Sequence, residues 1–208
     1  MRLSLFKTVA AGAVALSLVA GGAVVAQAQL TQNPAEVRAG TYALDAGHGK
    51  VTWSVSHMGF STYVGQFVNL SAELKLDPAN PSAATLTATI PLTDVAPNDD
   101  ALKGHLQTPD FFDTANHPTA TFVSRSVTID ASDPSEATVV GDLTLRGVTR
   151  PVTLEVEFNQ AGEVMGAYRV GFDAETTIKR SEFGINYALP AVSDEVKLHI
   201  EGEFTPKG

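Results

Sequence analysis

The sequence predicts a single all-β domain, and two observations support this fold class. Apolar residues alternate with polar ones from Thr41 onward, as Val51, Trp53 and Val55 do with the residues between them. Short runs rich in Gly, Pro, Asp, Asn and Ser separate the alternating segments. The chain has no cysteine, so packing and backbone pairing must hold it together. The alternation and the separating turns together predict roughly eight antiparallel strands joined mainly by short hairpins, in a sandwich or a closed barrel.

The individual strands are expected where the two-residue period recurs. These segments are 51–57, 70–76, 86–92, 122–129, 139–145, 152–158, 168–174 and 196–204. Turn chemistry marks the connections at 77–83, 130–136, 146–151 and 159–163. No internal repeat interrupts this pattern, so one domain is the simplest organisation.

Residues 93–118 depart from the alternation. Asn98 is a candidate cap for a short helix in which Leu102 and Leu106 lie one turn apart. A connection of this length in a compact domain tends to be functional, so we expect it to form a lid over one end of the strands.

The same segment contains the motif TPDFF, which predicts a second helical turn. Thr108 can cap this turn with its hydroxyl, and Pro109 suits its first position. Phe111 and Phe112 cannot face the same way on one turn, so at least one should enter the apolar interior. Two interpretations stay open, a core plug and a lid that touches a ligand.

The first 28 residues have the pattern of a secretory signal. Arg2 and Lys7 precede an uncharged apolar run, and Ala26–Ala28 forms an A-x-A cleavage site. We therefore expect cleavage after Ala28, a mature amino terminus at Gln29 and export to the periplasm; a membrane anchor is the rival interpretation. Residues 29–40 are polar without periodicity and are expected to be a flexible leader to the domain at 41–208.

Charge excludes some partners. The whole chain has 14 basic and 23 acidic residues, a net charge of −9, and removal of the signal lowers this to −11. Nucleic acid is not expected as a partner, because phosphate binding needs a cationic face. No thiolate chemistry is available, and no second apolar segment predicts a stable membrane span.

Four motifs resemble the YceI-like family of exported bacterial proteins, in the family's order. They are HGKVTWSVSHMGFSTYVGQF (48–67), LKGHLQTPDFFDTANHPTATF (102–122), GDLTLRGVTRPV (141–152) and IKRSEFGINYALPAVSDEVKLHIEGE (178–203). The resemblance spans nearly all of the mature chain. It implies an extended, lipocalin-like antiparallel barrel whose apolar lumen holds a polyisoprenoid or another long-chain lipid, such as an isoprenoid quinone, a prenyl pyrophosphate or a fatty amide.

Candidate lumen residues come from the apolar strand faces and from these motifs. They are Trp53, Val55, Phe67, Phe111, Phe112, Phe122, Leu143, Leu145, Leu154, Tyr168, Val170, Phe172 and Phe183. Each could equally pack an ordinary core. The hydroxyl of Tyr168 could also reach a polar head group while its ring lines the wall.

Four further motif residues are candidates for binding a ligand head group. His57, His105, Arg146 and Arg180 stand near expected strand ends, and arginine can grip a phosphate with two hydrogen bonds. The alternative for Arg180 is a structural salt bridge, with either Glu182 or Asp194 as its partner.

Metal binding, haem binding and catalysis are weaker interpretations of the same sequence. The five histidines show no tight ligand spacing, so no metal or other cofactor is expected, and His57 alone could serve a haem. A lipid isomerase or cyclase could use His105 with Asp110. The protein could also be a packed barrel without ligand, acting in stress or interaction, and a homodimer stays open.

Overall fold

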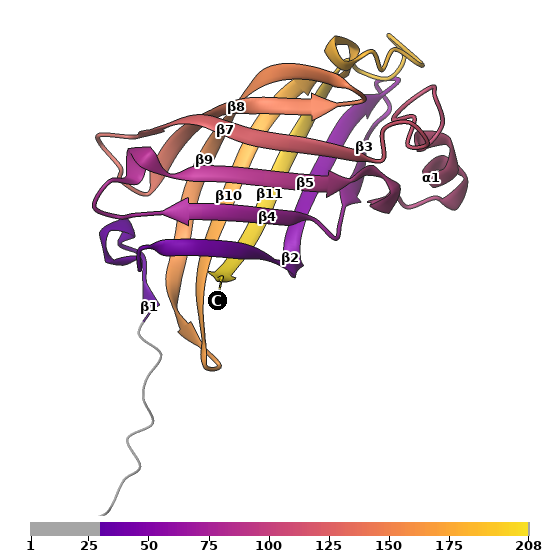
Figure 1. The fold of residues 1–208 in the computed structure, drawn as a ribbon. Coiled ribbons are helices and arrows are strands. Elements are labelled where there is room, and N and C mark those ends of the chain that lie inside the picture. The colour runs from indigo at the N-terminus through magenta and orange to yellow at the C-terminus, as the bar shows by residue number, and fades with distance from the viewer. Residues whose placement is uncertain (1–29, 208) are drawn as a thin grey trace, which may run out of the picture.

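The computed structural model describes residues 30–207, and its main feature is one antiparallel sheet that closes on itself. The strands of the closed sheet, in neighbour order, are β11 (Glu195–Pro206), β10 (Ala167–Lys179), β9 (Val148–Val164), β8 (Glu136–Leu145), β7 (Thr119–Ile129), β5 (Thr85–Pro91), β4 (Ser71–Leu76) and β2 (Gly40–His57). β11 pairs back onto β2, which completes the barrel (Figure 1). The predicted antiparallel barrel of about eight strands is confirmed.

The long strand β2 changes partner along its length. Residues 40–43 pair with β4, whereas residues 51–57 pair with β3 (Ser61–Phe67). β11 follows the other edge of β2 across both regions. The barrel wall is therefore made by β4 near one end and by the β2–β3 hairpin near the other.

Short elements complete the two ends of the barrel. They are β1 (Leu30–Thr31), the 3₁₀ turns η1 (Pro34–Glu36), η2 (Pro81–Ala83), η3 (Leu92–Asp94) and η4 (Arg180–Phe183), β6 (Val95–Ala96) and the helix α1 (Asp100–Leu106). Figure 1 shows β1 and α1 at opposite ends of the barrel. No helix within residues 30–207 has the length and apolarity needed to cross a membrane.

Residues 30–39 hold defined elements where a flexible leader was expected. Leu30 and Thr31 pair with Gly162 and Ala161 of β9, and the Asn33 side chain caps η1. Val37 is only 4% exposed and packs in an apolar cluster with Tyr42 and its neighbours. Because most residues of this segment are polar, the sequence did not indicate that Val37 anchors it. The expected signal segment and cleavage site lie outside the described residues.

The 93–118 connection contains the expected helix, with a different cap. The Asp99 side chain, rather than that of Asn98, accepts the hydrogen bond from the Leu102 N–H, at 2.7 Å. The Thr108 hydroxyl does not cap a second helix. It donates to the carbonyl of His105 at the end of α1, and residues 108–113 form hydrogen-bonded turns.

The two adjacent phenylalanines of this connection point in different directions, as their spacing predicts. Phe112 packs edge-on against Phe67 at 5.4 Å between ring centroids. Phe111 meets the rings of His105 and Tyr187 instead, at 5.0 Å and 5.3 Å. Both are half-buried and pack against the main core, so the segment covers the α1 end of the barrel.

Candidate functional site

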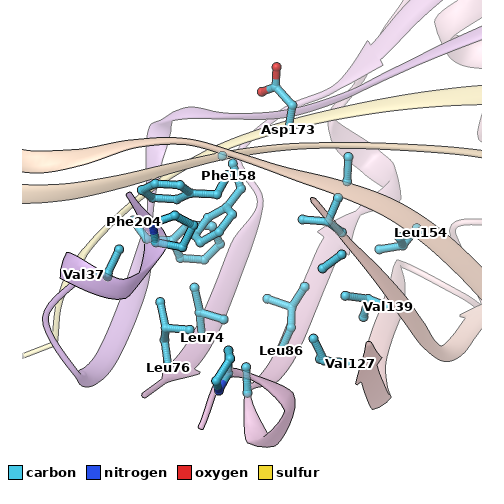
Figure 2. A pocket seen from close by; sticks show the side chains of 18 of the residues that line it. Val37, Leu74, Leu76, Leu86, Val127, Val139, Leu154, Phe158, Asp173 and Phe204 are labelled. Carbon is cyan, nitrogen blue, oxygen red and sulfur yellow. The ribbon is translucent and has the colours of Figure 1, made fainter. Parts of the chain in front are cut away.

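The barrel encloses an apolar cavity of about 370 Å³ in the half that lies away from α1. Its walls are inward-facing residues from all eight strands of the closed sheet, together with Leu70 and the turns at one end (Figure 2). The apolar strand residues of the wall are Leu44, Ala72, Leu74, Leu76, Leu86, Ala88, Val127, Ile129, Ala137, Val139, Leu154, Val156, Phe158, Phe172, Ala174, Ile200, Gly202 and Phe204. Alternation within each strand puts these side chains on the inner face, because successive residues point to opposite faces.

Three connections form the mouth of this cavity. They are η1 with Pro34 and Ala35, the β4–β5 connection with Pro78 and Pro81, and the β7–β8 connection with Pro134. Proline has a fixed φ and no N–H to satisfy, so it gives the rim an apolar surface on a stiff backbone. A chain-like ligand could enter between these connections without disturbing the strands.

The inside of the cavity is nearly free of charge. Asp173 and Glu201 are the charged residues among those that line it, and in Figure 2 the Asp173 carboxylate points away from the space. No lysine or arginine lines the cavity in the part of the chain that the structure describes. Such a wall offers hydrophobic contact and no cationic partner for a phosphate.

The mouth itself is acidic. Asp77, Asp130, Asp133 and Glu36 lie in its three connections, whose one basic residue, Arg38 just after η1, pairs with Glu163 at 3.5 Å. Hydrogen bonds from the Ser132 hydroxyl and backbone N–H groups lower the pKa of Asp130, and those from Ser135 lower the pKa of Asp133. Both carboxylates are therefore charged at neutral pH and repel an anionic head group.

The structure separates the thirteen predicted lumen residues into three groups. Leu154 and Phe172 line the cavity. The second group packs in the larger apolar cluster and does not line the cavity: Trp53, Val55, Phe67, Phe111, Phe112, Phe122, Leu143, Leu145 and Phe183. Tyr168 and Val170 belong to a smaller cluster beside the N-terminal segment. Direct contact with a ligand stays a prediction for each of these residues.

Tyr168 holds the N-terminal segment in place. Its hydroxyl oxygen accepts the backbone N–H of Arg38 at 3.1 Å, and the Arg38 guanidinium lies 4.2 Å from the centre of the Tyr168 ring. Tyr42 donates its hydroxyl to the Arg38 carbonyl from the other side. Tyr168 thus secures the chain just after η1, which forms part of the mouth.

Arg180 has a different partner from either of those considered. It is 5% exposed, and its guanidinium donates to the carbonyls of Ser193, Ile185, Tyr187 and Val192 at 2.7–3.1 Å. Asp194 instead accepts from the N–H and hydroxyl of Ser181. Burial lowers the pKa of Arg180, and the Asp194 charge partly offsets this effect. The guanidinium fixes the loop after η4.

The other head-group candidates lie near α1 and do not line the cavity. Arg146 donates to the carbonyls of Gly184 and Pro109, which joins the η4 loop to the TPDFF turn. His105 lies 3.0 Å from the Asp110 carboxylate. His57 ends β2 and forms a bridge with Val192. Head-group binding by these residues stays a prediction.

Sequence reasoning selected residues from the family motifs and from some apolar strand faces, and it missed most of the cavity wall. The alternation did place Leu74, Leu76, Leu86 and Ile200 on inner strand faces. Pairing register, which decides how far along the barrel each residue lies, could not be read from that pattern. The prolines of the mouth were visible as turn residues, but nothing in the sequence placed their three turns together.

Known proteins resemble this chain over most of its length. The sequence model of one protein family, the YceI-like domain, matches residues 42–204. Protein YceI of Escherichia coli O6:H1 is 40% identical over 157 residues, which cover 75% of this chain and 81% of the relative.

Two solved structures share the fold. BcnA of Burkholderia cenocepacia has a TM-score of 0.68 at 28% identity, over 77% of this chain and 98% of that chain. A polyisoprenoid-binding domain from Saccharophagus degradans has a TM-score of 0.60 at 16% identity, over 82% of this chain and 100% of that chain. The family model and the YceI relative together establish that this chain belongs to the YceI-like family.

Proposed function

We propose that this protein is an exported, periplasmic binding protein that carries an isoprenoid-like lipid in its barrel. The observation that carries the proposal is the apolar cavity of about 370 Å³, which lies within the 300–1,000 Å³ range of small-molecule sites. The name of the structural neighbour from Saccharophagus degradans supports an isoprenoid as the ligand class.

The lipid that fits this site best has an uncharged head group, such as an alcohol, a quinone or an amide. A chain that enters tail first leaves its head at the acidic mouth. A pyrophosphate there would meet four carboxylates, whereas Arg38, the one basic residue of the mouth connections, already lies beside Glu163 and the Tyr168 ring. An uncharged head avoids that repulsion and stays hydrated outside the apolar wall.

The decisive experiment compares farnesol with farnesyl pyrophosphate by calorimetric titration of the purified mature protein. We expect tighter binding of farnesol. Higher salt should improve binding of the pyrophosphate by screening repulsion, while farnesol binding changes little. Preference for the pyrophosphate, weakened by salt, would contradict the uncharged head group. Failure of both ligands to bind would contradict a prenyl-lipid cargo.

A wall substitution tests where the lipid binds. Ala88 lies on the inner face of β5 and lines the cavity, whereas its neighbour Thr87 is exposed on the outer face. Ala88→Phe should fill the space and abolish farnesol binding. Thr87→Phe is the matched control and should bind normally. Equal affinity of the two variants would place the ligand elsewhere.

A further inference from the structure

The lumen of this barrel is divided into an open half and a packed half. Small residues, including Ala88, Ala137 and Ala174, line the open half. The packed half towards α1 contains the large side chains of Trp53 and Phe122. The barrel is therefore not a through tunnel, and an entering chain must meet this boundary.

Phe122 forms the boundary on the β7–β8 side. Its backbone pairs with Ala88 of β5, and Ala88 lines the cavity whereas Phe122 does not. The Phe122 ring extends over Gly141 of β8, where an added methyl group would overlap the end of the ring. Glycine at this position lets the ring lie across the inner wall, immediately beyond the open space.

Trp53 occupies the packed half in the same way. Its indole lies over Gly65 of β3, where an added methyl group would overlap the ring, and it stacks on Tyr63 with 6.0 Å between centroids. Both aromatic side chains are more than nine-tenths buried. Two glycine and aromatic pairs on different strands thus fill the lumen with rigid rings.

The open volume sets how much hydrocarbon can enter. A cavity of about 370 Å³ lies at the small end of the 300–1,000 Å³ range of small-molecule sites, so it should hold a few isoprene units and not a whole long polyprenyl chain. A longer chain must leave its remainder at the mouth, because the rings block the far half.

We propose that Phe122, supported by Trp53, limits chain length and makes this protein selective for short isoprenoids or for one short end of a longer lipid. This inference rests on the proposed lipid-binding function and adds a limit on the part of the lipid that is bound. Each isoprene unit that lies inside the cavity should increase the affinity of the lipid, whereas a unit outside the mouth should add none.

The test is a titration with uncharged prenyl alcohols of increasing length: geraniol, farnesol, geranylgeraniol and solanesol in a fixed low detergent concentration. Wild-type affinity should rise on the order of tenfold or more per unit that enters and then level off at farnesol or geranylgeraniol. Trp53 is the single tryptophan of the chain, so its fluorescence reports a tail that reaches the boundary.

Three variants change the limit in opposite directions. The levelling point is the alcohol length beyond which affinity stops rising. Phe122→Ala should move it to a longer alcohol. Phe122→Leu should give a smaller shift in the same direction and serves as the test if the alanine variant folds poorly. Ala174→Leu fills the open half and should move the point to a shorter alcohol. Phe183→Ala is the control, because this side chain is also buried in the same cluster but sits in η4, outside the barrel strands.

The outcomes separate this inference from the proposed function. Wild-type affinity that keeps rising to solanesol, or a levelling point that Phe122→Ala and Phe122→Leu leave unchanged, would overturn the chain-length limit while lipid binding stands. An equal shift in Phe183→Ala would also overturn it, since general loosening would then explain the effect. Binding of none of the alcohols would remove the proposed function and the limit together.

Discussion

At the scale of single residues, Arg180 shows how a buried charge can be stabilised without a carboxylate in contact. Its planar guanidinium reaches four carbonyls of the loop that follows η4. A carbonyl that loses its donor inside the protein keeps its desolvation cost. The same donors that could have gripped a phosphate are occupied by the protein's own backbone.

Replacement of Arg180 by alanine should therefore reduce stability and leave ligand selectivity unchanged. We expect a loss on the order of 3 to 5 kcal/mol in the free energy of unfolding, measured by urea denaturation, because several buried acceptors lose a charged donor. Arg180→Lys should recover only part of this loss, since an ammonium has three donors and no fork geometry.

The control for this prediction is Arg150→Ala. Arg150 is exposed and makes one hydrogen bond, of 3.3 Å, to the Glu182 carbonyl, so its loss should cost little. A stable Arg180→Ala protein that selectively loses farnesyl pyrophosphate affinity would show instead that the guanidinium binds the head group.

At the scale of elements, an exterior ionic cluster joins three strands of the barrel. Arg169 of β10 donates to Asp45 of β2 at 2.8 Å and to Glu203 of β11 at 2.9 Å. Asp45 also contacts His48 at 2.9 Å. The cluster lies where the register of β2 with β11 shifts, near Gly202 and Phe204. It therefore supports the seam that closes the barrel.

The Asp45 cluster predicts a specific loss of stability in acid. The hydrogen bond from Arg169, followed by those from His48 and the Gly47 N–H, lowers the pKa of Asp45 from 3.8 to about 2. Because the folded pKa is below the unfolded one, the stabilisation is complete above about pH 4 and is lost as pH falls towards 2.

Asp45→Asn tests this dependence. Its Tm should be slightly below that of the wild type at neutral pH, since exposed ion pairs contribute little, and the two values should converge as pH falls from about 4 to about 2. A Tm difference that stays constant across this pH range would show that the charge of Asp45 does not contribute.

At the scale of the whole molecule, the barrel combines a rigid end with an open one. The packed half holds the rings of Trp53, Phe67 and Phe122, together with the cover formed by α1 and the TPDFF turn. Within residues 30–207, the open half ends in three connections and no α-helix covers it. Local opening is easiest where few apolar contacts hold the chain, so ligand exchange is expected through the proline-lined mouth.

Hydrogen exchange with and without farnesol should map this asymmetry. We expect added protection in η1, at the C-terminal end of β4 and in the 130–135 connection, because a bound lipid bridges the elements around the mouth. Protection of α1 and residues 108–113 should change little. Strong added protection in 108–113 would favour the interpretation of Phe111 and Phe112 as a lid that touches lipid.

The sequence by itself determined the all-β class, the approximate strand positions and the apolar inner face, because the two-residue period is a local property of a strand with one buried side. It also located the interruption at residues 93–118 and the different directions of Phe111 and Phe112, since adjacent residues on one turn cannot face the same way. Family motifs added the barrel and its lipid-binding lumen as expectations.

Only the tertiary structure decided which half of that lumen is open. Phe122 and Ala88 both belong to alternating apolar faces, yet Phe122 fills the interior whereas Ala88 lines open space. The Phe122 ring can lie across the inner wall because Gly141 on the neighbouring strand has no side chain. The sequence likewise left Arg180 as a candidate for ligand binding, whereas in the folded loop its guanidinium donates to backbone carbonyls. Register and side-chain volume act between strands far apart in the chain, so no local pattern encodes them.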